Sequence, residues 1–219
     1  MALKAKKPQA KEKRLKMFVY GPAGVGKTTG VIQFPSSYII DTEKGTDFYD
    51  KTINAQNSVV LQTLNIGEVK EELHALVTEK HAYKTLVIDP ITQVYNNVQE
   101  KWTRIFERHA KTQKIAETQD FGLRFWGKVK GDFKGLQRQM LAVDMNVIVT
   151  AHQKDAYPNG VKFGTTFDSM RGDDYLFDLV FELERTNGSL VAKKIKERAE
   201  IGENKFPETF EWSYENFCK

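Results

Sequence analysis

Residues 16–29 constrain this chain more than any other stretch, because they carry the spacing of a phosphate-binding loop. Gly21, Gly26, Lys27 and Thr28 fit G-x-x-x-x-G-K-[ST], between an apolar run (17–20) and a helix-compatible stretch (28–34). Glycines let successive backbone N–H groups turn inward on a polyphosphate, and the N-terminus of the following helix attracts the same anion. The predicted nucleotide-binding residues are Gly21, Pro22, Ala23, Gly24, Val25, Gly26, Lys27, Thr28 and Thr29.

Two side chains of this loop have expected chemical roles. Lys27 should reach the β and γ phosphates, and the Thr28 hydroxyl should ligate Mg²⁺. The alternative, an ordinary glycine-rich turn, is disfavoured by the apolar run before the loop and the helical stretch after it. The sequence therefore predicts a nucleotide-binding protein with ATP and Mg²⁺ as cofactors.

Composition indicates one ordinary α/β domain. The 219 residues suffice for a sizeable core, and no apolar run approaches the roughly 20 residues of a membrane span. The basic N-terminus lacks the apolar segment of a secretory signal. Cys218 is the one cysteine, so no internal disulfide can form, which fits a reducing compartment. We expect a cytoplasmic protein (in a bacterial host, if phage-encoded) without a membrane partner.

Charge is concentrated at the start of the chain. Residues 1–16 hold seven basic side chains and one acid, while the whole chain has a net charge of +4. We expect a basic flexible arm over 1–15 and an ATPase domain over 16–219. Such an arm suits contact with a polyanion, although a solvated tail explains the charges equally well.

Strand-like and helix-like stretches alternate along the chain. Strands are expected at 37–40, 58–64, 84–88 and 146–150, with helical spacing across 68–80 and 91–117. This alternation predicts a mostly parallel sheet covered by helices. Stretches 176–184 and 189–195, joined through Asn187-Gly188, predict a C-terminal β-hairpin. Residues 154–173 show no periodicity, so we expect a functional or mobile loop there.

A further helix is expected to carry two distinct faces. Its apolar face holds Trp126, Val129, Phe133, Leu136, Met140 and Val143. Gly127, Gly131 and Gly135 lie four apart on a second face, beside basic residues, and each glycine costs about 1 kcal/mol relative to alanine. Close approach by a neighbouring element or by a nucleic acid would explain them, and we favour packing on the sheet.

Two carboxylates suit the chemistry of ATP hydrolysis. Asp89 ends a predicted strand downstream of the phosphate loop, where it would hold the metal, although an aspartate that caps a helix before Pro90 is the alternative. Glu43 ends another predicted parallel strand, so it is placed to orient the attacking water. A guanine-reading N-K-x-D motif is absent from the sequence.

Four blocks in this order resemble the core of RecA-type recombinases: residues 21–28, 40–43, 87–89 and 150–153. The short chain and Ile39-Ile-Asp-Thr-Glu-Lys-Gly45 resemble more narrowly the phage RecA-like single-strand annealing ATPases. The resemblance covers about residues 16–200 and implies a RecA-like P-loop NTPase core. Two departures stand out: residues 1–16 are too short for RecA's N-terminal helical domain, and the region after Asp89 is longer than expected.

The resemblance also implies roles for individual residues. Glu43 falls at the catalytic carboxylate, and Gln153 at a glutamine that senses the γ-phosphate. Lys196 and Arg198 fall where basic residues reach a neighbouring subunit's ATP, although a solvated strand end explains them too. The second DNA-binding loop corresponds to 154–173, and the first lies somewhere in 108–134.

The sequence thus predicts an ATP-dependent single-stranded-DNA-binding protein that promotes annealing or pairing in phage homologous recombination. We expect a homo-oligomer, ring or filament, with ATP between subunits and with a single-strand-binding protein as a possible further partner. A hexameric-helicase-type motor, an ATP-gated DNA-binding module with negligible turnover and a nucleotide kinase are the alternatives. The expected DNA-binding residues are Arg124, Lys128, Lys130, Lys134, Lys154, Lys162, Phe163, Phe167 and Arg171.

Overall fold

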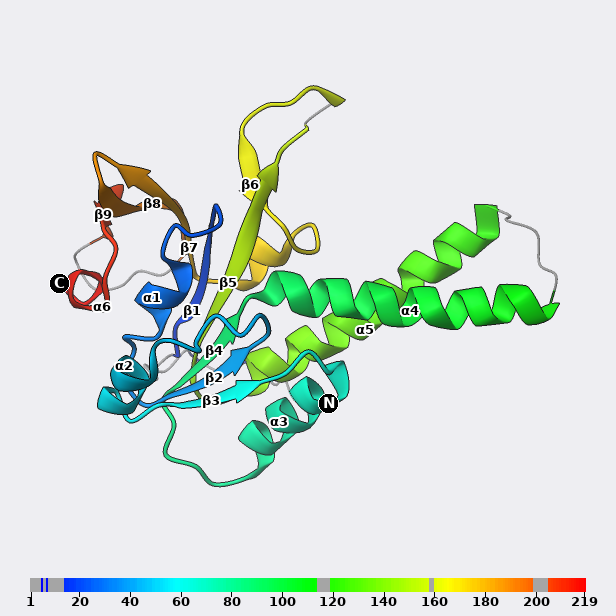
Figure 1. The fold of residues 1–219 in the computed structure, drawn as a ribbon, viewed down its shortest axis with the longest axis horizontal. Coiled ribbons are helices and arrows are strands. Elements are labelled where there is room, and N and C mark those ends of the chain that lie inside the picture. Colours follow the sequence, from blue (N-terminus) through cyan, green and yellow to red (C-terminus); the bar gives the residue numbers. More distant parts are fainter. Residues whose placement is uncertain (1–4, 6, 8–13, 114–118, 158–159, 199–204) are drawn as a thin grey trace.

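The computed structural model describes residues 5, 7, 14–113, 119–157, 160–198 and 205–219 (Figure 1). Most of the expected basic arm therefore lies outside the described residues. The elements, in chain order, are β1 (Lys16–Gly21), α1 (Lys27–Val31), β2 (Ser37–Asp41), α2 (Asp50–Ala55), β3 (Val59–Gln62), α3 (Ile66–Thr78), β4 (Thr85–Asp89), α4 (Ile91–Gln113), α5 (Gln119–Ala142), β5 (Asn146–Asp155), β6 (Thr165–Phe167), the 3₁₀ helix η2 (Asp173–Leu176), β7 (Leu179–Thr186), β8 (Ser189–Glu197), β9 (Thr209–Glu211) and α6 (Tyr214–Phe217).

One sheet organises the described chain. Strands β3, β2, β4, β5, β1 and β7 lie side by side in that order and are parallel, and β8 and β9 extend the sheet through antiparallel pairs. Runs such as 17–20 and 86–88 are buried, as expected of parallel strands covered on both faces. The predicted α/β class, the mostly parallel sheet and the C-terminal hairpin are confirmed.

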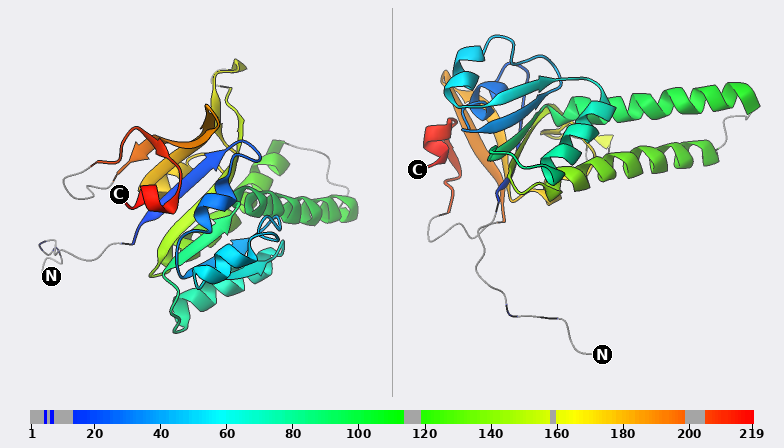
Figure 2. Two further views of the ribbon diagram at one scale, coloured as in Figure 1. Left: turned by 60° about the vertical axis from the view of Figure 1, so that its left-hand side comes forward. Right: turned by 90° about the horizontal axis from the view of Figure 1, so that it is seen from below.

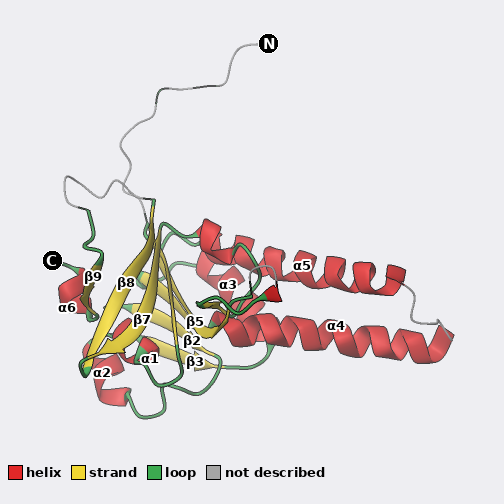
Figure 3. Ribbon diagram, turned by 90° about the horizontal axis from the view of Figure 1, so that it is seen from above, coloured by secondary structure: helices red, strands yellow, loops and turns green. Residues whose placement is uncertain are grey.

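Helices cover the two faces of the sheet, as the views in Figures 2 and 3 show. Alternate side chains of β1 point to opposite faces: Phe18 packs in the cluster with α3, α4 and α5, whereas Met17 and Val19 pack in the cluster with α1 and α2. This alternation follows from the period of two residues in a strand. Each core side chain of a strand is thereby buried under the helices of one face of the sheet or of the other.

Helices α4 and α5 extend together beyond the sheet (Figures 1 and 3). On α5, Val129, Phe133, Leu136 and Met140 are buried as predicted. Trp126, expected on the same buried stripe, is 44% exposed, and its ring lies edge-on to that of Phe125 at 5.1 Å between centroids.

The base of this helix pair is fastened by a polar cluster. Asp132 of α5 accepts hydrogen bonds from Lys101 at 2.8 Å and from the Trp102 indole at 3.1 Å, and it also pairs with Lys70 of α3. Burial alone would raise the pKa of Asp132, but the two ammonium groups more than offset burial and hold that pKa below its ordinary value.

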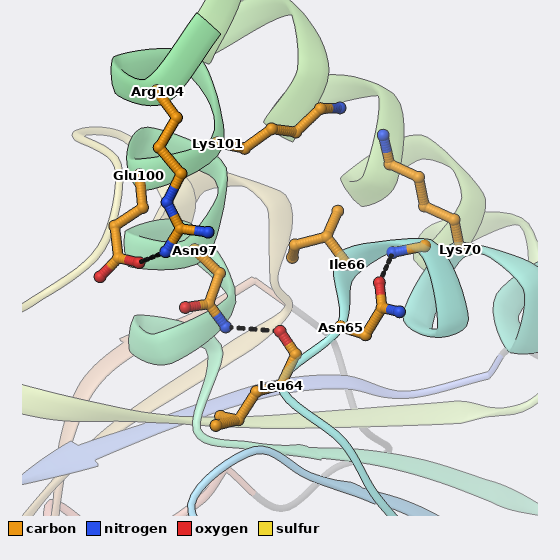
Figure 4. Close-up of a pocket in the computed structure, with 9 residues that line it drawn as sticks. Leu64, Asn65, Ile66, Lys70, Asn97, Glu100, Lys101 and Arg104 are labelled. Carbon is orange, nitrogen blue, oxygen red and sulfur yellow. Dashed lines mark hydrogen bonds and ion pairs between the residues drawn. The ribbon is translucent and has the colours of Figure 1, made fainter.

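A hollow of about 560 Å³ lies where α3 meets α4 (Figure 4). Its rim is bonded within itself, since Arg104 pairs with Glu100 at 3.2 Å and Asn97 donates to the Leu64 carbonyl at 2.9 Å. The contact of Asn97 with Leu64 ties the segment before α3 to the side of α4. No residue that lines the hollow belongs to the phosphate loop.

The α5 glycines do not pack on the sheet, contrary to our expectation. A Cβ atom added at Gly127, Gly131 or Gly135 would meet no other heavy atom within 4 Å. The sheet-facing side of α5 is the apolar one, so the glycines point away from it. Close packing on another described part of the chain does not explain these residues.

Within 154–173, where we expected a functional or mobile loop, the described residues 154–157 and 160–173 include two strand segments and the start of η2. Strand β5 continues to Asp155, and β6 returns beside it through the pairs Gln153↔Phe167, Lys154↔Thr166 and Asp155↔Thr165. Figure 1 shows this β5–β6 hairpin projecting from the sheet. The hydrophobic alternation missed it because much of the hairpin is exposed on both faces.

The helix η2 precedes β7, which starts at Leu179 instead of the expected 176. Asp173 explains the difference: it is buried, accepts a hydrogen bond from Gln137 at 2.8 Å, and bonds the Ser169 hydroxyl. Burial raises the pKa of Asp173 to about 6, although both hydrogen bonds oppose the shift.

The C-terminal segment packs against α1. Trp212, directly after β9, is 4% exposed and lies over Gly30, where an added Cβ would stand 1.8 Å from the indole Nε1. Phe34 stacks edge-on with Tyr214 at 4.8 Å between ring centroids. The helix that follows the phosphate loop is thus held between the sheet and the last residues of the chain.

Candidate nucleotide-binding site

The phosphate loop joins β1 to α1 and depends on its glycines. Gly24 and Gly26 have φ values of 69° and 111°, which side chains with a Cβ rarely adopt. Gly21 is needed for a different reason, since a Cβ there would lie 2.7 Å from the Leu183 carbonyl oxygen. Val25, which we expected to bind nucleotide, is 2% exposed and turns its side chain into the core.

A cavity of about 260 Å³ opens over this loop. It is lined by six of the predicted binding residues and by side chains from four other segments: Ala23, Gly24, Gly26, Lys27, Thr28, Thr29, Glu43, Gly45, Tyr49, Asp89, Pro90 and His152. The structure therefore brings the phosphate loop, Glu43 and Asp89 together around one cavity, as the sequence predicted. Gly21 and Pro22 do not line the cavity, and their carbonyl oxygens accept hydrogen bonds from Lys27.

Lys27 is folded back onto the loop. Its ammonium donates to the carbonyl oxygens of Gly21 and Pro22, each at 2.9 Å, and the residue is 9% exposed. Burial lowers the pKa of Lys27, while the nearby carboxylates of Asp89 and Glu43 oppose that shift. An arriving polyphosphate would offer this ammonium stronger, charged acceptors.

Asp89 ends β4 between two threonine hydroxyls. Thr28 of α1 donates to it at 2.6 Å, and Thr150 of the intervening strand β5 donates to its other oxygen. Burial raises the pKa of this carboxyl group, and both hydroxyl contacts oppose the shift. Asp89 therefore has a structural partner on each oxygen and faces the threonine of the loop.

These residues fit a magnesium ion that is shared with a nucleotide. Among the described residues, no group of three or more His, Cys, Asp or Glu side chains could hold a metal alone. Mg²⁺ commonly takes only one or two protein ligands and completes its shell with phosphate oxygens and water. Thr28 and Asp89 supply that kind of partial ligand set, and the ion would neutralise phosphate charge there.

Asp41 builds the loop that carries Glu43. Its carboxylate accepts hydrogen bonds from the backbone N–H groups of Glu43, Gly45 and Thr46 at 3.0, 3.2 and 2.9 Å, and from the Thr46 hydroxyl at 2.6 Å. Asp41 is 1% exposed, so water does not compete for these bonds. The backbone position of Glu43 is thereby fixed.

The Glu43 side chain meets His152 across the cavity. Its two carboxylate oxygens lie 3.0 and 3.1 Å from the His152 Nε2, and both side chains are 38% exposed. Glu43 is thus at the cavity as predicted, bonded to a histidine that the sequence analysis did not single out.

A family model described as an AAA domain matches residues 13–199. The chain belongs to the AAA domain family. The match covers the sheet from β1 through β8 and includes the phosphate loop, so this AAA domain has a P-loop NTPase fold and is of the nucleotide-binding ATPase type. The search of curated proteins gave no significant match.

Gln153, which we expected to contact the γ-phosphate, lies outside the nucleotide cavity of the AAA domain. Its amide donates to the Thr165 hydroxyl at 2.9 Å and to Glu182 at 2.8 Å, and it does not line the cavity. Successive strand residues point to opposite faces, so His152 faces the phosphate loop and Gln153 faces β7. In this structure His152 lines the cavity and Gln153 does not, and the γ-phosphate contact of Gln153 stays a prediction.

Lys196 and Arg198 lie near the ends of the strands opposite to those that carry the phosphate loop. Lys196 pairs with Val180, which in turn pairs with Phe18, near the start of β1. The Lys196 ammonium donates to the carbonyls of Asp174 and Phe177, and Arg198 donates to that of Tyr175 at 2.8 Å. Neither reaches the cavity of its own chain.

The expected DNA-binding residues lie in the hairpin region, just before η2 and on α5, and all are exposed except Phe167, which is half-buried. Phe163, at 77% exposure, lies in the hairpin, where Lys154 pairs with Asp168 and Lys162 with Asp155, each at 2.8 Å. Phe167 does not belong to this surface, because its ring packs against Phe18 at 5.0 Å between centroids. Exposed positions elsewhere are Arg171, before η2, and on α5 Arg124, Lys128, Lys130 and Lys134.

The sequence analysis did not predict three residues of the site: Asp41, Thr150 and His152. Asp41 pairs with Asp89 across the β2–β4 ladder, so a second acid at the end of a predicted parallel strand was the available signal. Thr150 and His152 alternate on β5 and face the Asp89 side, a pattern visible once the strand is extended past residue 150. No helix within the described residues is long and apolar enough to cross a membrane.

Proposed function

We propose that this AAA domain hydrolyses ATP with Mg²⁺ and binds single-stranded DNA, promoting strand annealing or pairing. The observation that carries the proposal is the continuity of β5. The strand lines the nucleotide cavity at His152 and becomes the β5–β6 hairpin at the next residue. A ligand on the hairpin is therefore connected to the nucleotide by a single hydrogen-bonded strand.

The hairpin suits unpaired bases better than duplex. Tyr157, Val161 and Phe163 are 59, 70 and 77% exposed, and aromatic faces stack on unpaired bases for about 1–3 kcal/mol each. The two lysines of the hairpin are paired with aspartates, so stacking contributes more there than charge. The basic side chains of α5, including Arg124, Lys128, Lys130 and Lys134, supply the phosphate attraction in this proposal.

Glu43 is the proposed base that orients the attacking water, and Thr28 and Asp89 hold the metal. Lys196 and Arg198, remote from their own cavity, are proposed to act on ATP held by a neighbouring subunit of a ring or filament. A cytoplasmic location and a single-strand-binding protein as partner belong to the same proposal.

The decisive experiment measures ATP turnover with and without single-stranded DNA, together with fluorescence anisotropy of a labelled oligonucleotide across a salt series. We expect salt-sensitive binding that tightens with a non-hydrolysable ATP analogue and weakens in Phe163→Ala. Val77→Ala, on the far helix α3 and 45% exposed, is the matched control and should bind normally.

No oligonucleotide binding at low salt in any nucleotide state would contradict the DNA part of the proposal. Glu43→Gln tests the chemistry separately: ATP should still bind, and turnover should fall by roughly 10²-fold or more, as when a general base is removed. Directional unwinding of a tailed duplex would favour a helicase-type motor, and negligible turnover would favour a passive binding module.

A further inference from the structure

The hollow between α3 and α4 takes no part in the proposed function (Figure 4). Its lining comes from the segment before α3, from the first turns of α3 and from one side of α4. Its volume of about 560 Å³ lies within the usual range of ligand pockets. A hollow of this size has room for a few side chains of a bound peptide.

Positive charge predominates in this lining. Lys70, Lys101 and Arg104 line the hollow together with one acid, Glu100. Figure 4 shows the side chains of Lys70 and Lys101 extending toward one another from α3 and α4. Asp132 of α5 pairs with both ammonium groups, and its side chain is only 12% exposed. Because one carboxylate cannot neutralise two ammonium groups, this pair of lysines keeps a net positive charge beside the hollow.

The cations of the lining have capacity for a further anion. An ammonium group has three N–H donors, and the bond to Asp132 takes one of them in each lysine. Arg104 pairs with Glu100 at 3.2 Å, but these two side chains are 72% and 59% exposed, and such exposed pairs contribute little. An arriving carboxylate therefore competes only with a weak contact.

The lining also offers an aliphatic surface. Leu64 is 57% exposed although its side chain is large and apolar, and Ile66 lines the same hollow. The Asn97 amide donates to the Leu64 carbonyl at 2.9 Å, which holds this segment against α4. Of the described residues that line the hollow, none is aromatic, so a nucleobase would find no ring to stack on. An aliphatic side chain would instead remove Leu64 from water.

We propose that this hollow is a docking site for an acidic peptide segment of a partner protein. Carboxylates of the peptide meet Lys70, Lys101 and Arg104, and one of its aliphatic side chains covers Leu64 and Ile66. The charge of the lining selects an acidic partner, and the aliphatic surface favours a peptide over a nucleotide. The site shares no residue with the nucleotide cavity, so this inference does not depend on the proposed ATPase and DNA-binding function.

The test is fluorescence anisotropy of a labelled peptide of six aspartates and two leucines, titrated with the full-length protein across a salt series. We expect binding that weakens as salt rises, because the cations lie at the surface. Arg104→Glu should weaken binding about three- to tenfold, since an attractive exposed pair becomes repulsive. Leu64→Ala should weaken it by a similar factor, because less apolar surface is buried. Lys80→Glu makes the same change of charge beyond the far end of α3 and is the matched control.

The two variants separate docking from general attraction between charges. No binding at low salt, or wild-type affinity in Arg104→Glu, would overturn the proposal. A loss in Arg104→Glu with wild-type affinity in Leu64→Ala would overturn it too, because charge alone would then explain the binding. If labelled oligo-dT loses affinity in both variants as the peptide does, the hollow is a nucleic-acid surface and the peptide proposal fails.

A second measurement locates the site without any substitution. In amide NMR spectra of the wild type, the peptide should shift the signals of Gly67 and Lys101, which lie on the two sides of the hollow. The signal of Lys193, exposed on β8, should remain in place. Shifts confined to other parts of the chain would overturn the proposal.

Discussion

Replacing Gly30 by alanine should destabilise the fold although it adds a better helix former. The new Cβ would stand 1.8 Å from Nε1 and 2.6 Å from Cδ1 of Trp212, where ordinary contacts begin near 3.4 Å. Trp212 cannot swing aside, because it is 4% exposed and surrounded by the rings of Phe181, Phe210 and Phe217. Either α1 or the C-terminal segment must move.

The expected magnitude follows from two opposed effects. Alanine gains about 1 kcal/mol over glycine in a helix, whereas displacing a buried tryptophan costs about 3–5 kcal/mol, as in truncations of large core side chains. The net loss of unfolding free energy should be about 2–4 kcal/mol. Because α1 carries Lys27 and Thr28, affinity for Mg·ATP should fall as well.

Urea denaturation checks this prediction, with Gly131→Ala as the matched control. No heavy atom lies within 4 Å of a Cβ at Gly131, so the same substitution there should stabilise by about 1 kcal/mol. The Gly30→Ala midpoint should fall by roughly 1 M, given an m-value of a few kcal/mol/M. Adding Trp212→Leu should recover part of the loss. A wild-type midpoint for Gly30→Ala, or no recovery in the double variant, would refute the packing argument.

Three further predictions follow from the site and its surroundings. Lys27→Ala should weaken Mg·ATP binding and abolish hydrolysis, and calorimetry showing wild-type affinity would refute the loop assignment. Asp173→Asn should change the pH dependence of stability, because folding raises the pKa of this carboxyl group from 3.8 to about 6 and the wild-type protein therefore loses free energy of unfolding as the pH rises between those values. Relative to wild type, the variant should gain at most about 3 kcal/mol of unfolding free energy from pH 4 to pH 7. Urea titrations at several pH values measure this, and parallel curves for the two proteins would contradict it. A Lys196→Ala/Arg198→Ala variant should bind ATP but turn it over slowly, and mixing it with Glu43→Gln protein should restore some activity; no recovery in a co-assembled mixture would exclude a shared site.

The sequence predicted those features that depend on local pattern. Apolar runs identified the parallel strands, Asn187-Gly188 located the hairpin turn, and the loop spacing placed Lys27 and Thr28. Asp89 and Glu43 were found because carboxylates at the ends of parallel strands gather at one edge of a sheet. These inferences need only periodicity and topology.

The features that it missed depend on side chains meeting across the fold. Gln153 was named from the family resemblance, which does not show that His152 is the residue of this strand that faces the cavity. The α5 glycines were assigned to packing because sequence shows which residues share a face but not whether anything opposes it. Phe167 was assigned to an exposed surface because the sequence does not show that its ring packs against Phe18.

The two parts of β5 should differ in local stability. Amides of residues 147–149 lie between β4 and β1 in the middle of the sheet and should exchange with deuterium only through global unfolding. Amides of 153–155 are held by the three-residue partner β6 and should exchange through a smaller, local opening. The boundary between these two cooperative units falls at the residue that touches Glu43, so fraying of the outer unit ends at the edge of the nucleotide cavity.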